Sequence, residues 1–448
     1  MSESPIAWPS LPKIVQPLVR RHAEDAAFYW TQLDGASQAT GLNAQRLIHF
    51  QRLLEAHLEG LRVAGIDGMP LTQEALVRWR KPGEAFAACA AALSISGGAE
   101  ARAYALEPLL RTIRQLPDVL LRGFISALAW TDAAQVEPWL RGALVSDDPV
   151  LRVAALRACS LHGLRVERWH LHAHHQDAHV RAAACRAAGP EHLRELATLR
   201  DDADLQVRAE SAIAWARLMP EGERRAEDAA QAASLLWRCV SEQIELTETR
   251  SGWYRMQAQR RLNRWLCHLA WLAPLGHAGV PQLLAQLPPR LALSFLLHHG
   301  DAAQLKFVVQ ATGQPAVARW ALWVWRCLTG VDPQVAGLTL PDAPPDLDAP
   351  LSTDQRDADQ GLPLPDVAAV AAHPGSHIVL EVGERLLMGQ PVRAHALRTL
   401  LDPAADQPQA LRFVAAHALT QLHPAYALNV RASPAVQAAQ LARMGVAP

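Results

Sequence analysis

Apolar residues recur at steps of three and four along most of this chain, which is the spacing of one face of an α-helix. In the stretch 42–64 the recurring residues are Leu47, Phe50, Leu54, Leu58 and Leu61, and Gly65 follows. Glycine commonly ends helices, so a helix is expected to stop there. Helical spacing also runs through 17–34, 226–248 and 254–273. The pattern predicts an all-α chain.

One short pattern, Asp-x-x-Φ-Arg with Φ apolar, occurs three times in the middle of the chain. The copies span Asp148–Arg152, Asp177–Arg181 and Asp204–Arg208, so their offsets are 29 and 27 residues, and an alanine-rich run follows each one. A unit of this length fits two short helices that stack on the next pair. The repeats predict a HEAT-like α-solenoid.

The repeated aspartate has a structural interpretation. Placed just before a helix, Asp148, Asp177 and Asp204 would accept hydrogen bonds from the free N–H groups of the first turn. Arg152, Arg181 and Arg208, four residues later, would lie within side-chain reach of these carboxylates. We therefore expect a ladder of caps and arginines along one edge of the stack.

The organisation expected from this reading has four parts: an atypical helical N-terminal cap (1–82), the HEAT-like repeats (83–330), an acidic extended segment (331–366) and C-terminal helical repeats with a cap (367–448). Residues 332–366 contain eight aspartates, seven prolines and one arginine. So polar a segment cannot bury itself. Leu362–Pro365 is expected to dock on the helices in extended form, with Leu338, Leu340, Leu362 and Leu364 as anchors, and 349–360 to be mobile.

The composition narrows the range of partners and compartments that we expect for this chain. The chain has 43 Lys and Arg, only three of them lysine, against 44 Asp and Glu, giving a net charge of −1. Near-neutrality makes a nucleic-acid partner unexpected. The six cysteines are scattered without a C-x-x-C pair, as in a reducing compartment. With no signal-like N-terminus and no unbroken apolar span, we expect a cytoplasmic protein without a membrane segment.

A histidine-rich stretch at 162–179 is the candidate metal site. In it, His170 and His174, like His175 and His179, have the i, i+4 spacing that suits Zn²⁺ on a helix. They straddle a repeat boundary, however, and no cysteine completes a set of ligands. We expect a solvated turn and no metal or cofactor; the alternative is a metal-dependent enzyme that uses His162–His179.

Two aromatic stretches are candidates for partner contacts. Residues 250–265 combine five arginines with aromatic rings, which suits either nucleic acid or the wet face of an amphipathic helix. Trp320, Trp323 and Trp325 lie in an almost wholly apolar helix that is expected to be core. The candidate partner-binding residues are Trp253, Tyr254, Arg260, Arg261, Arg264 and Trp323. Neither H-E-x-x-H, G-x-S-x-G nor a Walker A sequence occurs, and no catalytic residue is assigned.

Several short motifs add a context. They are LEAHLEGLRVAG at 54–65, GEAFAA at 83–88, LTGVD at 328–332, GLPLPD at 361–366 and RLLMGQPV at 385–392. In this order they resemble an uncharacterised proteobacterial HEAT-repeat family encoded in type VI secretion gene neighbourhoods. The chain departs from that family at 369–378, which lacks its tryptophans.

The resemblance implies a non-catalytic, protein-binding scaffold whose partner is a type VI secretion effector or spike component. The chain would act as an adaptor or chaperone for an effector, or as an immunity protein; these two roles remain open. The alternative function is a nucleic-acid-binding HEAT-like solenoid. The oligomeric state is left open as well.

Overall fold

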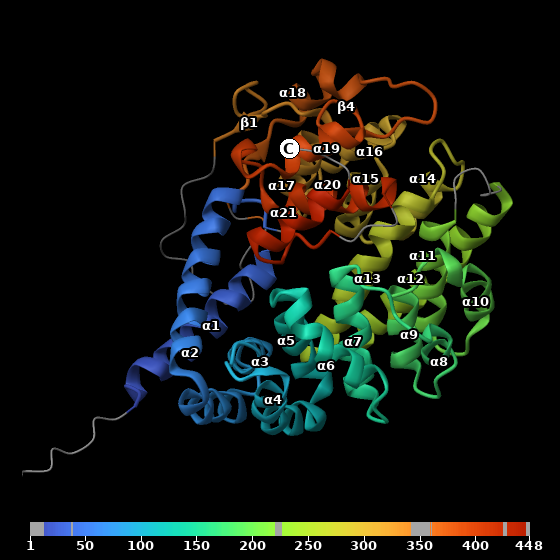
Figure 1. Cartoon of the computed structure of the whole chain (residues 1–448). Coiled ribbons are helices and arrows are strands. Elements are labelled where there is room, and N and C mark those ends of the chain that lie inside the picture. The colour runs from blue at the N-terminus through green and yellow to red at the C-terminus, as the bar shows by residue number, and fades with distance from the viewer. Residues whose placement is uncertain are drawn as a thin grey trace, which may run out of the picture. The chain divides into compact units, whose positions relative to one another are not determined.

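The computed structural model describes residues 13–36, 39–219, 226–341, 359, 361–423 and 428–444. Helices dominate these residues, and the strands among them are four two-residue segments, which confirms the all-α prediction (Figure 1). Contacts divide the chain into two compact units. The first comprises 1–35, 47–162 and 431–436, and the second 36–46, 163–430 and 437–448.

The first unit is built of long helices that pack on their second neighbours along the chain, with α3 against α1 and α5, and α5 against α7. Its helices are α1 (Gln16–Gly35), most of α2 (Ala44–Trp79), α3 (Pro82–Leu93), α4 (Gly98–Gln115), α5 (Pro117–Trp130), α6 (Ala133–Leu144) and α7 (Pro149–His162). Gly65 interrupts α2 with φ 55° and ψ −142°, so the helix end predicted there is confirmed as a kink.

A glycine makes the contact between α3 and α5 close. A Cβ at Gly123 would lie 2.1 Å from the carbonyl oxygen of Pro82, so a side chain there would force the two helices apart. The facing side of α3 is made of small residues, among them Ala85 and Ala88, which are fully or almost fully buried. The alanine-rich runs of the sequence thus serve close helix packing.

The second unit contains the other repeats and the C-terminal helices. They are α8 (Trp169–Ala173), α9 (Ala178–Arg186), α10 (Leu193–Thr198), α11 (Leu205–Leu218), α12 (Ala226–Thr249), α13 (Gly252–Leu272), α14 (Val280–Gln286), α15 (Pro289–His299), α16 (Leu305–Ala311), α17 (Ala318–Thr329), α18 (Val367–Ala372), α19 (Ala394–Leu401) and α20 (Gln409–Leu422). Short 3₁₀ turns lie at Pro190–His192, Leu199–Asp201, Ala302–Gln304, Pro374–His377 and Pro403–Ala405. The last helix, α21 (Pro434–Arg443), belongs partly to each unit.

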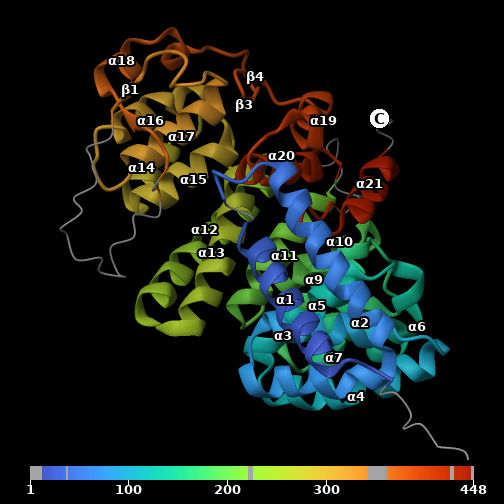
Figure 2. The same cartoon turned by 90° about the vertical axis from the view of Figure 1, so that its left-hand side faces the viewer.

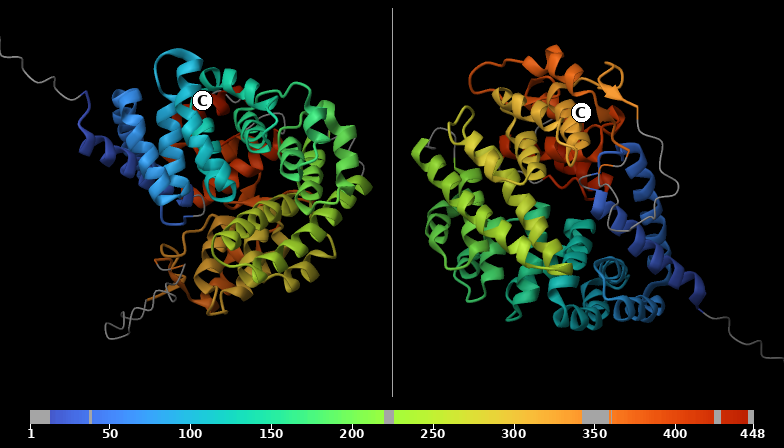
Figure 3. Two further views of the ribbon diagram at one scale, coloured as in Figure 1. Left: turned by 90° about the horizontal axis from the view of Figure 1, so that it is seen from below. Right: turned by 180° about the vertical axis from the view of Figure 1, so that it is seen from behind.

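Contacts within the second unit again join helices close in sequence. Helix α11 packs on α9 and α12, α12 and α13 lie side by side, and α15 contacts both α13 and α17 (Figure 3). Helix α20 returns from the C-terminal region to contact α13 and α15. Four helices, α13, α15, α17 and α20, therefore surround one core.

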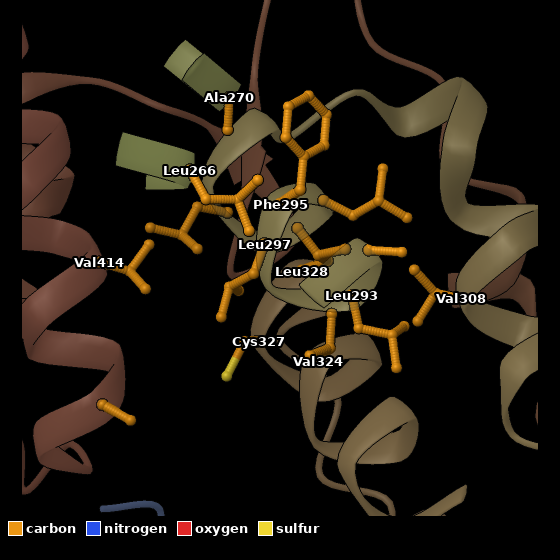
Figure 4. Packing of buried hydrophobic residues seen from close by; sticks show 14 of the residues in the cluster. Leu266, Ala270, Leu293, Phe295, Leu297, Val308, Val324, Cys327, Leu328 and Val414 are labelled. Atoms are coloured by element: carbon orange, nitrogen blue, oxygen red, sulfur yellow. The ribbon is translucent and has the colours of Figure 1, made fainter. Parts of the chain in front are cut away.

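That core is apolar, and each of the four helices contributes side chains to it. Leu266 of α13, Phe295 of α15, Val324 of α17 and Val414 of α20 all belong to one buried cluster (Figure 4). Trp320, Trp323 and Trp325 are buried as well, so the prediction that the tryptophan-rich helix is core is confirmed.

The four short strands form two antiparallel pairs within the second unit. Strand β1 (Thr339–Leu340) pairs antiparallel with β2 (Leu364–Pro365), and β3 (Leu386–Leu387) pairs with β4 (Gln390–Pro391) (Figure 2). Within the described ranges, none of the helices combines the length and the apolar character that crossing a bilayer requires.

Candidate functional site

Each aspartate of the repeat lies at the start of its helix, where it accepts backbone hydrogen bonds. Asp148 accepts from the N–H of Val150 at 2.9 Å. Asp177 accepts from the N–H groups of His179 and Val180, and Asp204 from those of Gln206 and Val207. The predicted caps are therefore present in all three copies.

The arginines of the repeat donate hydrogen bonds to backbone carbonyls. Each reaches the loop before its helix: Arg152 donates to the carbonyl of Ser146, Arg181 to those of His175 and Gln176, and Arg208 to those of Asp202 and Ala203. Arg181 also forms a bidentate pair with Asp202 at 2.8 Å for both bonds, and Arg208 bonds Glu242. A guanidinium carries five N–H donors in a fixed fork, so one arginine can donate to several loop acceptors at once.

We expect Asp177→Ala to lower the free energy of unfolding by about 1 kcal/mol, because two N–H groups of the first turn lose their acceptor. Urea unfolding of the purified protein measures this. Asp201→Ala is the control, since that side chain is exposed, and a change within about 0.5 kcal/mol is expected for it. Equal losses in both variants would contradict the capping role.

The histidine-rich stretch is dispersed by the fold. His162 ends α7, where its ring Nε2 lies 2.9 Å from the carbonyl oxygen of Leu128. His170, His174 and His179 are exposed, and the Nδ1 of His175 accepts from the N–H of Asp177 at 3.0 Å. In the described part of the chain, no three His, Cys, Asp or Glu side chains come together as a set able to hold a metal ion.

Protein purified without an affinity tag or added metal is expected to carry well under about one zinc or nickel ion per chain, because an incomplete ligand set seldom retains metal. Elemental analysis of the protein measures the content. Stoichiometric metal that disappears in the His170→Ala/His174→Ala variant would contradict this prediction.

The arginine-rich face of α13 is only partly available to a partner. Tyr254 is 53% exposed, and the guanidinium of Arg260 lies 5.6 Å from the ring centre of Trp253. Arg264, by contrast, donates two hydrogen bonds, of 3.3 and 3.1 Å, to the carboxylate of Glu210. Arg261 is half-buried. The candidate contact residues therefore do not form one free basic surface.

Glu210 is the centre of a buried charge cluster. Its side chain is inaccessible to solvent, and it accepts hydrogen bonds from Arg186 of α9, Arg264 of α13 and the indole Nε1 of Trp265. Burial raises the pKa of Glu210, but the two guanidinium groups outweigh burial and hold this pKa well below its usual range. The cluster joins α9, α11 and α13.

A cavity of about 290 Å³ lies among α13, α15, α17 and α20. Two helices line it with polar residues at four-residue intervals: Gln259, Asn263 and Cys267 from α13, and Arg290, Ser294 and His298 from α15. Aromatic residues complete the wall, namely Trp320, Trp323 and Phe413. The i, i+4, i+8 spacing keeps each set on one helix face, so both helices turn a polar edge toward the same space.

Arg290 is the charged group of this cavity. It forms a bidentate ion pair with Asp359, with both bonds at 2.8 Å, and its guanidinium lies 4.5 Å from the ring centre of Trp320. Trp320 in turn stacks on Trp323, with ring centres 4.7 Å apart and an interplanar angle of 19°. The flat aromatic surface and the ion pair fix the plane of the guanidinium.

Buried neutral histidines lie behind the cavity. The ring of His417 contacts those of His298 and His268 edge to face, at centroid distances of 5.2 and 4.6 Å. Burial lowers the pKa of His298 to about 4, and burial with nearby arginines holds the pKa values of His268 and His417 well below 6.5. The adjacent thiol of Cys267 has its pKa raised by burial to about 12. At neutral pH Arg290 is the one charged residue among the described residues that line the cavity.

The acidic segment contacts the helices beside the cavity. Leu338 and Leu362 are buried in the core of the second unit, and the carbonyl of Leu362 accepts a hydrogen bond from Arg319. Leu362–Pro365 thus docks on the helices as predicted, and its last two residues form β2. Leu340 is 45% exposed, so its predicted role as an anchor is wrong. Of the predicted mobile stretch 349–360, only Asp359 lies within the described residues, and it is buried.

Sequence reasoning missed Glu210, Arg290, Asp359 and the three buried histidines whose rings meet edge to face. A signal existed in the regular polar positions of α15, where Arg290, Ser294 and His298 interrupt an apolar run every four residues. Glu210, a single acid within an alanine-rich helix, was a similar signal. A scan against models of known protein families, a search of curated proteins and a search of solved structures each found no match to this chain.

Proposed function

We propose that this chain is a HEAT-like α-solenoid and a non-catalytic protein-binding scaffold. In this proposal it works in the cytoplasm as an accessory protein of a type VI secretion module, either as an adaptor or chaperone for an effector or as an immunity protein. The context comes from the motif resemblance at 54–65, 83–88, 328–332, 361–366 and 385–392.

The observation that carries the binding proposal is the docked acidic segment. Helix α17 contacts β2, Arg319 donates to the backbone carbonyl of Leu362, and Leu338 and Leu362 are buried. A helical surface that holds an extended piece of its own chain by a backbone hydrogen bond and apolar anchors has the chemistry to hold a piece of another chain.

Local packing supports the solenoid. In each unit, helices pack on their second neighbours, as α3, α5 and α7 do in the first, and α9 with α11 and α13 with α15 in the second. The three capped repeats have the same order of loop, cap and helix. Stacking of this kind buries faces that a single helix pair leaves open.

Thiol chemistry supports a non-catalytic role. Burial raises the pKa of Cys159 and Cys239 to about 11, and that of Cys267 to about 12. Such thiols are protonated at neutral pH and are weak nucleophiles. Cys89, Cys185 and Cys327 are likewise buried with raised pKa values.

The test is chemical crosslinking of tagged protein in its native host, followed by affinity purification and mass spectrometry. We expect one protein of a secretion module to be enriched over an unrelated tagged helical protein. Deletion separates the two roles: loss of an immunity protein harms the cell only when the cognate toxin is active, whereas loss of an adaptor abolishes delivery.

If no protein is enriched, and the chain instead shifts single-stranded or duplex DNA at about 50 mM salt, where phosphate contacts are strong, the nucleic-acid alternative replaces this proposal.

A further inference from the structure

The cavity among α13, α15, α17 and α20 has the dimensions of a binding site for one side chain. Its volume of about 290 Å³ is just below the range of small-molecule pockets, which is about 300–1,000 Å³. Its walls are aromatic and apolar, with a few polar groups along two helix edges. This suits one large apolar side chain that enters with polar atoms beside it.

The charge of the residues that line the cavity determines whether a negative or a positive ligand fits. Among the described residues around the cavity, Arg290 is the one permanent cation, no carboxylate belongs to the wall, and His298 is neutral because burial lowers its pKa to about 4. A ligand with a negative group near its apolar side chain therefore complements this site, and a cationic one does not.

Asp359 identifies the kind of anion that Arg290 accepts. Its two oxygens meet the guanidinium in the parallel, bidentate arrangement that arginine forms with carboxylates, and Trp320 holds the guanidinium plane from one side. The chain thus places one of its own carboxylates on the arginine that lines the cavity. Asp359 is a contact that a carboxylate of another chain can replace, since 42% of the Arg290 side chain is exposed.

Two ring nitrogens of the wall also have unmade hydrogen bonds. Within the described residues, the buried Nε1 of Trp320 and Nδ1 of His298 have no hydrogen-bond partner. Trp320 is 7% exposed. Buried polar atoms are rarely left in this state, and a polar ligand atom within reach would relieve the cost.

We propose that this cavity binds an acidic segment of a partner protein: an aromatic or large aliphatic side chain enters between Trp323 and Phe413, and a neighbouring carboxylate replaces Asp359 on Arg290. This deepens the proposed scaffold function and rests on it. Asp359 acts as an internal competitor that lowers the affinity for the partner.

Fluorescence anisotropy with a defined probe tests this. The probe is a fluorescein-labelled peptide of sequence GSGDWDGSG, with GSGNWNGSG and GSGDGDGSG as comparisons. Asp359→Asn is expected to bind the probe about fivefold or more tightly than wild type, because the guanidinium of Arg290 loses the carboxylate that occupies it. The single variant Arg290→Gln and the double variant Arg290→Gln/Asp359→Asn are each expected to bind the probe at least about tenfold more weakly than Asp359→Asn does.

Arg326→Gln is the matched control. Arg326 lies on α17, pairs with Asp332 at 3.2 Å and has 43% of its side chain exposed, against 42% for Arg290. It is expected to leave probe affinity unchanged. Thermal unfolding of each variant shows whether it is folded, and the three peptides test the proposal on folded wild type and Asp359→Asn even if Arg290→Gln fails to fold.

The proposal is overturned if Asp359→Asn does not bind the probe, if the neutral peptide or the one lacking tryptophan binds it equally well, or if Arg326→Gln weakens binding as much as Arg290→Gln. Tighter binding of a labelled oligouridylate than of the peptide also overturns it in favour of nucleic acid. If the native partner is still enriched by folded Arg290→Gln, the scaffold function stands and the cavity is not its site; if no partner is enriched by wild type, the scaffold function itself fails.

Discussion

Glu210→Ala is expected to lower the free energy of unfolding by about 3–5 kcal/mol, the range measured when one member of a buried ion pair is removed. The fully buried carboxylate holds Arg186, Arg264 and the Nε1 of Trp265. Without it, Arg186 keeps its charge in a buried position, where burial already lowers its pKa to about 10. Urea unfolding followed by circular dichroism measures the loss.

Glu242→Ala is the matched control for this prediction. Glu242 also accepts from an arginine of the repeats, Arg208, but 53% of its side chain is exposed. Exposed pairs contribute about 0–1 kcal/mol, so its removal has a small effect. Replacing Arg186 and Glu210 together by leucine is expected to destabilise less than Glu210→Ala alone, because no buried charge is left without its partner. A loss below 1 kcal/mol for Glu210→Ala would contradict the assigned role.

Lowering the pH from 6.5 to 5 is expected to reduce the free energy of unfolding by at least about 2 kcal/mol, because four buried histidines stay neutral in the folded protein. Burial lowers the pKa values of His298 and His299 to about 4, and holds those of His268 and His417 well below 6.5. The unfolded chain binds protons at these rings near 6.5, so each adds a slope of up to about 1.4 kcal/mol per pH unit.

The direction of this effect and the pH range in which it acts distinguish it from the loss of carboxylate ion pairs at acidic pH. Stability from the neutral histidines is complete above pH 6.5 and falls as the pH drops toward 4. The depressed pKa of Glu210 acts below about 4.5, where the unfolded carboxylate begins to bind protons. Urea unfolding between pH 5 and 8 therefore isolates the histidines.

A variant provides the control for the pH prediction. His298→Leu removes one proton-binding ring, and its unfolding free energy should depend less steeply on pH between 5 and 6.5 than that of wild type. His170→Leu, at an exposed position, should leave the slope unchanged. A wild-type stability that is flat over this interval would contradict the prediction, because it would show that these rings bind protons in the folded protein as readily as in the unfolded chain.

Local features of the fold followed from the sequence because their causes span only a few residues. The caps at Asp148, Asp177 and Asp204 bond N–H groups two or three positions ahead, and Gly65 takes a positive φ by itself. Helical spacing likewise predicted the tryptophan-rich helix, which has no polar face and is therefore expected to be buried. The period of the repeat predicted which helices begin with the same aspartate cap.

Contacts between distant residues were decided only by the tertiary structure. Glu210 reaches Arg186 across 24 residues and Arg264 across 54, and Arg290 meets Asp359 across 69. The sequence placed the arginines of the repeat within reach of the caps, but only the structure shows that Arg181 pairs with Asp202 and Arg208 with Glu242. A long charged side chain has many possible partners along a chain, and helix packing, through burial and desolvation, selects among them. The sequence alone therefore determined where helices start, bend and hide their apolar faces, whereas packing decided which charges meet and where a cavity remains.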